Sequence, residues 1–128
     1  MDDVCLPNLT FNKDHVFISL EGQLTVDRLL SLSIEMIESP EFVKGIPQIW
    51  EASNTDISDF DPSQIGYAVQ ELTRIWRHLP LSKVAIVSDN MINHCSIALF
   101  KELYELGKGL VEIFDTVLEA EIWVKSSL

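Results

Sequence analysis

Glycine, cysteine and basic residues are all scarce in this chain of 128 residues. It contains 5 glycines, 2 cysteines and 9 Lys or Arg against 20 Asp or Glu, which gives a formal net charge of −11. The glycines form neither a Walker loop nor a Gly-x-Gly-x-x-Gly fingerprint, so these nucleotide-binding motifs are excluded. Cys5 and Cys95 follow no Cys-x-x-Cys spacing, which indicates reduced thiols rather than a disulfide or a zinc framework.

The shortage of positive charge limits the possible partners. Residues 1–64 carry 12 acids and 3 bases, and such a field repels phosphate backbones and anionic lipid headgroups. No run reaches the roughly 18 to 20 apolar residues that span a bilayer, and Met1-Asp2-Asp3 lacks the positive start of a secretion signal. We therefore expect no nucleic-acid partner, no membrane insertion and a cytoplasmic protein.

Side chains that would assemble a catalytic centre are also missing. No Gly-x-Ser-x-Gly elbow occurs, and no ligands stand at zinc spacing. His94 and Cys95 are neighbours on one expected helix, so they point about 100° apart and cannot meet as base and nucleophile. The sequence predicts a protein that is not an enzyme and needs no metal or other cofactor.

The chain does have enough apolar residues for a core. Hydrophobic residues make up 47% of it, and its length fits a single domain over residues 1–128. The pattern predicts strands over Val4 to Phe11 and Val16 to Leu20, then strands over 48–52, 84–87 and 110–114. It predicts helices after the N-caps Thr25, Asp61 and Thr116, and a further helix that ends near Gly107. The element order is β-β-α-β-α-β-α-β-α, an α/β fold with a mixed, mostly parallel sheet flanked by helices.

An acidic segment from Glu51 to Asp61 follows the expected strand over 48–52, where open α/β sheets usually bind their ligands. Asp56, Asp59 and Asp61 offer oxygen ligands for a divalent cation, which would make a metal-dependent enzyme a third hypothesis. The calcium-loop pattern fails, however, because counting from Asp59 places Gln64 at the sixth position. We favour turn and cap roles for these aspartates.

Several motifs occur in an order that resembles the SpoIIAA-like proteins, small bacterial domains with the fold of STAS domains. The motifs are Gly22-Gln23-Leu24-Thr25, Ser39-Pro40-Glu41-Phe42, Lys83-Val84-Ala85-Ile86-Val87, Val111-Glu112-Ile113-Phe114-Asp115 and Glu119-Ala120-Glu121-Ile122-Trp123. The resemblance implies a non-enzymatic regulatory or protein-interaction module. In STAS antagonists a kinase phosphorylates a serine at a helix start. Pro62 takes the place of that serine in this chain, which leaves Ser63 beside it.

The resemblance leads to two hypotheses. In the first, a regulatory protein partner binds a face that contains Asp56, Ser58, Asp59, Asp61 and Ser63. In the second, the domain carries a small apolar ligand or a lipid, as Sec14-type relatives of the fold do, in a pocket lined by Trp50, Trp76, Phe100 and Tyr104. A cavity of a few hundred cubic ångströms would support the second hypothesis. We also expect a homodimer, formed through the edge hairpin and through Phe100, Tyr104 and Trp123 if these face outward.

Overall fold

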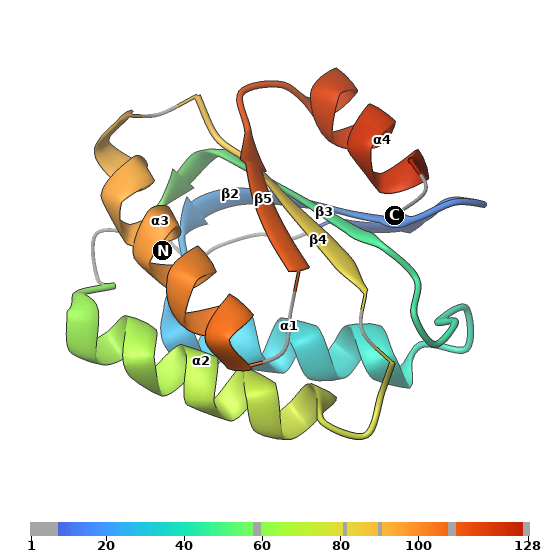
Figure 1. The fold of residues 1–128 in the computed structure, drawn as a ribbon, viewed down its shortest axis with the longest axis horizontal. Helices are drawn as coiled ribbons and strands as arrows, with labels where there is room; N and C mark the ends of the chain where they lie inside the picture. The colour runs from blue at the N-terminus through green and yellow to red at the C-terminus, as the bar shows by residue number, and fades with distance from the viewer. Residues whose placement is uncertain (1–7, 58–59, 81, 90, 108–109, 127–128) are drawn as a thin grey trace.

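The computed structural model describes residues 8–57, 60–80, 82–89, 91–107 and 110–126. Over this part of the chain the elements follow the predicted order, which confirms the α/β fold class (Figure 1). The elements are β1 (Asn8–Phe11), β2 (Val16–Gln23), α1 (Val26–Glu38), β3 (Gln48–Asp56), α2 (Pro62–Trp76), β4 (Lys83–Val87), α3 (Met91–Gly107), β5 (Leu110–Phe114) and α4 (Val117–Lys125).

The strands form one sheet in the order β1-β2-β3-β4-β5, in which β1 runs antiparallel to β2 and the other neighbours are parallel. Each parallel strand is added on the same side of the previous one. Because such crossovers are right-handed, α1, α2 and α3 lie on one face of the sheet. Helix α4 follows the last strand and lies on the opposite face, where it contacts β3, β4 and β5 (Figure 1).

The sheet therefore separates two apolar layers. Side chains alternate along each strand, so Val16, Ile18 and Leu20 of β2 all face the layer under α1, α2 and α3. The smaller layer under α4 is built around Ile49 and Ala85. The larger layer is the one that holds the candidate site described below.

The predicted helix caps are confirmed. The side chains of Thr25, Asp61 and Thr116 accept hydrogen bonds from the backbone N–H groups at the third helical positions, over 3.2, 2.9 and 3.2 Å. Each bond satisfies a backbone donor that has no partner within its own helix. These caps fix where α1, α2 and α4 begin, and therefore which of their side chains face the sheet.

Two strands run further than predicted. We expected the second strand to end at Leu20, before Gly22, and the third to end near residue 52, but β2 continues to Gln23 and β3 to Asp56. Gly22 and Gln23 pair with Thr55 and Asp56 beyond a register shift, and Gly22 adopts φ +87° there. A glycine reaches this left-handed backbone conformation without a steric penalty, so it continues the strand instead of ending it.

Candidate functional site

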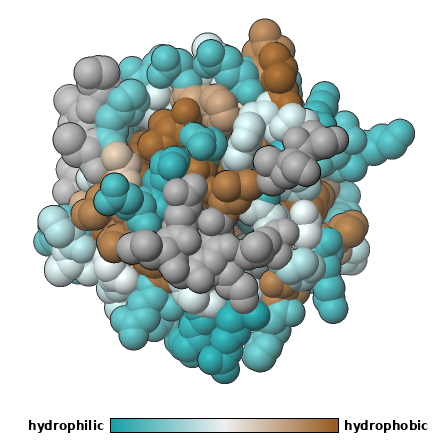
Figure 2. All heavy atoms as spheres, in the orientation of Figure 1, coloured by the Kyte–Doolittle hydropathy of each residue, from teal (hydrophilic) through white to brown (hydrophobic). Residues whose placement is uncertain are grey.

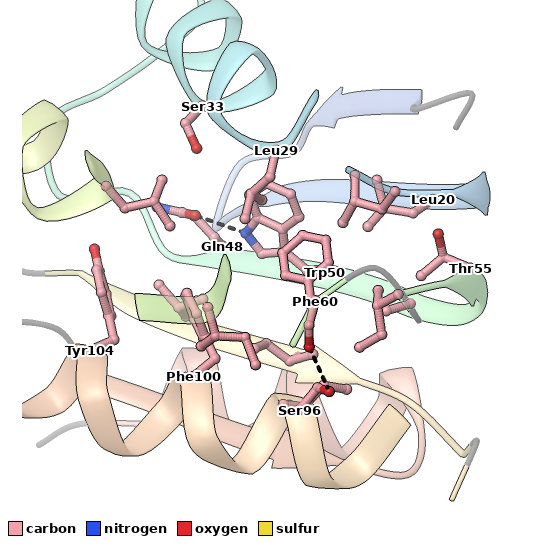
Figure 3. Close-up of a pocket in the computed structure, with 18 of the residues that line it drawn as sticks. Leu20, Leu29, Ser33, Gln48, Trp50, Thr55, Phe60, Ser96, Phe100 and Tyr104 are labelled. Carbon is pink, nitrogen blue, oxygen red and sulfur yellow. Dashed lines mark hydrogen bonds between the residues drawn. The ribbon is translucent and has the colours of Figure 1, made fainter. Parts of the chain in front are cut away.

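A cavity of about 110 Å³ lies between the sheet and helices α1, α2 and α3 (Figure 3). Its wall draws side chains from β2, β3 and β4 and from all three helices of this face. The lining residues are Leu20, Leu24, Leu29, Ser33, Gln48, Trp50, Ala52, Thr55, Ile57, Phe60, Ile65, Leu72, Trp76, Val84, Ile86, Ser96, Ile97, Phe100 and Tyr104. Most are aliphatic or aromatic, so the wall is largely apolar.

All four aromatic residues predicted to line a pocket do line this cavity. Trp50 comes from β3, Trp76 from the end of α2, and Phe100 and Tyr104 from α3. Phe100 and Tyr104 lie four residues apart on one helix face, and their rings stack with centroids 5.4 Å apart. The structure thus brings together four residues from three elements. That they bind a ligand stays a prediction.

Hydroxyl and amide groups interrupt the apolar wall at a few points. The indole N–H of Trp50 donates a 2.9 Å hydrogen bond to Oε1 of Gln48. The hydroxyl of Thr55 donates to a backbone carbonyl over 2.7 Å, and that of Ser96 donates to another over 3.4 Å. Ser33 and Tyr104 add two further hydroxyl groups to the wall. Sequence reasoning did not select Ser33 or Gln48 as site residues.

Charged groups do not contribute to the described lining, which contains no Asp, Glu, Lys, Arg, His or Cys. Burial raises the pKa of the Tyr104 phenol, because the apolar surroundings disfavour its charged form. The same surroundings would disfavour a charged ligand. Chemically, the cavity can hold an uncharged and mainly apolar molecule.

The residues predicted as a binding face in the acidic segment are not among those that line the cavity. Asp56 ends β3, Asp61 caps α2, and Ser63 lies at the second helical position, all three exposed. Ser58 and Asp59 lie outside the described residues. The Ser63 hydroxyl donates to Oδ1 of Asp61 over 2.8 Å, and the same oxygen accepts the backbone N–H of Gln64. These two bonds, the backbone one first, lower the pKa of Asp61.

The structure does not support a ligand crevice at this segment. Such a crevice forms where strand order reverses within an open sheet, and the order β1-β2-β3-β4-β5 has no reversal. Residues 53–56, which we expected to follow the strand, belong to β3 itself. In the part of the chain that the structure describes, no three His, Cys, Asp or Glu side chains are grouped closely enough to hold a metal ion.

The exposed apolar surface differs from the expected one. Tyr104 is only 9% exposed, and Phe100 lines the cavity and is half-buried, so neither is a mainly outward-facing side chain. Trp123 packs against Phe114, with ring centroids 5.6 Å apart. Instead, α4 presents Leu118 and Ile122, which are 66% and 64% exposed. Figure 2 shows hydrophobic side chains protruding at the upper edge of the molecule, where α4 lies.

Comparisons with known proteins identify the fold. No family model matches the chain, and no curated protein matches it. Among solved structures, it is similar to an uncharacterized protein of the DUF3478 family with a SpoIIAA-like fold, from Shewanella loihica PV-4. The two share 11% sequence identity with a TM-score of 0.60, over 97% of this chain and 98% of the other. This domain therefore has the SpoIIAA-like fold.

One further observation concerns membranes. Among the described helices, none combines the length and the hydrophobicity needed to cross a bilayer.

Proposed function

We propose that this domain is a non-enzymatic binding module that holds a small apolar molecule in the cavity beneath α1, α2 and α3. The observation that carries the proposal is the cavity itself, about 110 Å³ in volume and lined mainly by apolar side chains. Protein interiors are packed densely, and voids much larger than a water molecule are few. A cavity of roughly 150 Å³ with Leu, Ile and Phe walls stays dry and binds benzene or xenon.

The volume restricts the size of the ligand. Sites for drug-sized ligands typically measure about 300 Å³ or more, so this cavity is too small for a lipid chain of ordinary length. A molecule of one aromatic ring is a better match. Of the two ligands considered from the sequence, the small apolar molecule is therefore favoured over a lipid.

The lining supports binding rather than catalysis. General acid–base catalysis needs a titratable group within hydrogen-bond reach of the substrate, and nucleophilic catalysis needs an activated nucleophile. Tyr104 is the one titratable side chain in the described lining, and its raised pKa keeps the phenol protonated at neutral pH. Ser33 and Ser96 carry hydroxyls, but no histidine or carboxylate of the described lining stands beside them as a base.

A titration with toluene tests the proposal. Nuclear magnetic resonance of ¹⁵N-labelled protein should show a saturable shift of the Trp50 indole signal, because this N–H lies in the cavity wall. The variant Ala52→Leu, which places a larger side chain in the cavity, should abolish the shift. Ala98→Leu, on an exposed position of α3, should leave it unchanged. An absence of saturable shifts in the wild type would contradict the proposal.

A regulatory protein-interaction module is the second candidate, and the exposed surface of α4 favours it. Leu118 and Ile122 lie four residues apart and so share one helix face. Contiguous exposed apolar side chains mark interaction sites in soluble proteins. A homodimer is the partner we expect, and light scattering tests it. The wild type should have a dimer mass that falls to the monomer mass in the double variant Leu118→Gln, Ile122→Gln, whereas a monomeric wild type at high micromolar concentration would contradict it.

A further inference from the structure

The polar side chains of the cavity wall divide into two groups, one at each end. Gln48 is the first residue of β3 and Tyr104 lies near the end of α3, whereas Thr55 is near the end of β3 and Ser96 near the start of α3. A crossover helix runs antiparallel to the parallel strands that it connects, so the start of β3 and the end of α3 lie at the same end. Figure 3 shows Ser33 with Gln48 and Tyr104 toward one end, and Thr55 with Ser96 toward the other.

The two ends differ in how their polar groups are used. The hydroxyls of Thr55 and Ser96 donate to the backbone carbonyls of Gly22 and Phe60. At the other end, Gln48 accepts the Trp50 indole N–H through Oε1, and its amide nitrogen carries two more donors.

Ser33, Gln48 and Tyr104 are only 1%, 4% and 9% exposed. We call these three residues the polar end of the cavity. Burying such groups within an apolar wall costs free energy unless hydrogen bonds compensate it. A ligand with a hydrogen-bonding substituent would supply such bonds.

The composition of the cavity wall also restricts the charge of the ligand. A buried carboxylate or phosphate needs a cation beside it, and the described lining supplies no Lys, Arg or His. The chain also carries a formal net charge of −11, which repels anions as they approach. An anionic ligand is therefore disfavoured both as it approaches the protein and inside the cavity.

We infer that the cavity takes an uncharged molecule of one aromatic ring with a single hydroxyl or carbonyl substituent, and that this substituent hydrogen-bonds at the polar end. The inference rests on the proposed function and adds the chemical class of the ligand. Ring size follows from the volume of about 110 Å³, and the substituent follows from the buried groups at Ser33, Gln48 and Tyr104.

Three probes of similar size test the inference: phenol, toluene and benzoate, each titrated into the wild-type protein by calorimetry. In a cavity without a polar end, phenol would lose the hydration of its hydroxyl uncompensated and would bind more weakly than toluene. We expect phenol to bind at least as tightly as toluene, and benzoate to bind at least about tenfold more weakly than phenol. Tighter binding of toluene than of phenol, or of benzoate than of phenol, would overturn the inference.

Single-atom variants locate the substituent. Tyr104→Phe and Ser33→Ala should each lower the affinity for phenol relative to the affinity for toluene by about tenfold. Ser96→Ala, which removes a hydroxyl from the opposite end, should keep the wild-type ratio of the two affinities. An unchanged ratio in both Tyr104→Phe and Ser33→Ala would overturn the inference even where toluene binds. If neither phenol nor toluene binds the wild type, the proposed function itself fails.

Discussion

The indole of Trp50 and the amide of Gln48 form a hydrogen bond of 2.9 Å inside the wall of the cavity. The two residues are separated by one position on β3 and therefore point to the same face of the sheet. Both are at least nine-tenths buried. This bond satisfies the indole N–H, which has few other acceptors in an apolar layer, and it fixes the orientation of one of the two indoles in the wall.

Removing the acceptor of this bond should destabilise the fold. Gln48→Leu leaves the indole N–H of Trp50 buried without an acceptor, and we expect the free energy of unfolding to fall by about 1 to 3 kcal/mol. Urea denaturation measures the change. Gln70→Leu makes the same substitution at an exposed position of α2 and should have little effect. Equal losses in the two variants would show that the bond contributes nothing.

Two alanines on opposite faces of the sheet should respond differently to enlargement. Ala52 lines the cavity, whereas Ala85 is fully buried in the smaller layer under α4. Ala52→Leu should change the free energy of unfolding by less than about 1 kcal/mol, because its added carbons enter existing space. Ala85→Leu should destabilise by about 1 to 3 kcal/mol through overpacking. Thermal and urea unfolding compare the two, and an equal loss in both would argue against a cavity at Ala52.

The attachment of α4 depends on Lys83 of β4. Its ammonium donates to the backbone carbonyls of Trp123 and Ser126 over 2.8 and 2.6 Å, and it lies 5.2 Å from the centroid of the Trp123 ring. These bonds place a cation at the C-terminal end of α4, where the helix dipole favours positive charge, and they add to the backbone N–H of Ser126 that the Trp123 carbonyl also accepts. Lys83→Met should destabilise the fold by about 1 to 2 kcal/mol and speed hydrogen exchange in α4.

Lys125→Met is the control for this prediction. It removes the same charge from the last turn of α4, at an exposed position. A loss of stability as large as that of Lys83→Met would show that net charge, rather than the Lys83 hydrogen bonds, accounts for the effect.

The cap of α2 should make stability depend on pH in the acidic range. The pKa of Asp61 in the folded state is lowered below its ordinary value of 3.8, first by the Gln64 backbone N–H and then by the Ser63 hydroxyl. The unfolded chain therefore binds this proton at a higher pH than the folded one. The contribution of Asp61 to stability is fully present above the unfolded pKa and is lost as the pH falls through the folded pKa.

Urea denaturation at a series of pH values tests this sign. Asp61→Asn keeps a good N-cap but removes the titration, so the wild type should lose stability relative to this variant as the pH falls below about 4. Ser63→Ala should show a smaller loss than the wild type, because one of the bonds that lowers the pKa is missing. Parallel stability curves for wild type and Asp61→Asn would contradict the prediction.

Much of the fold could be predicted because its signals are local. Thr25, Asp61 and Thr116 each precede an apolar helical stripe, and each is an N-cap in the structure. The ends of β2 and β3 could not be predicted, because they depend on pairing between residues 33 positions apart, such as Gly22 and Thr55. A glycine normally indicates the end of a strand, and here the partner strand overrides that preference.

The site was predictable in part. Trp50, Trp76, Phe100 and Tyr104 were selected from the sequence as large aromatic residues that would line an apolar pocket, and they share one cavity. Gln48 and Ser33 carried a signal that was not used, since each is a polar residue on an otherwise apolar face of its element. The volume of the cavity depends on how three helices pack on one sheet, and no local pattern determines that.

Xenon binding tests the central claim most directly, because xenon is an apolar sphere that forms no hydrogen bonds and scatters X-rays anomalously. A crystal of the wild-type protein pressurised with xenon should show an anomalous peak in the cavity lined by Trp50 and Phe100, and a crystal of Ala52→Leu should show none there. A wild-type crystal with no peak in this cavity would contradict the claim that the domain holds a small apolar molecule.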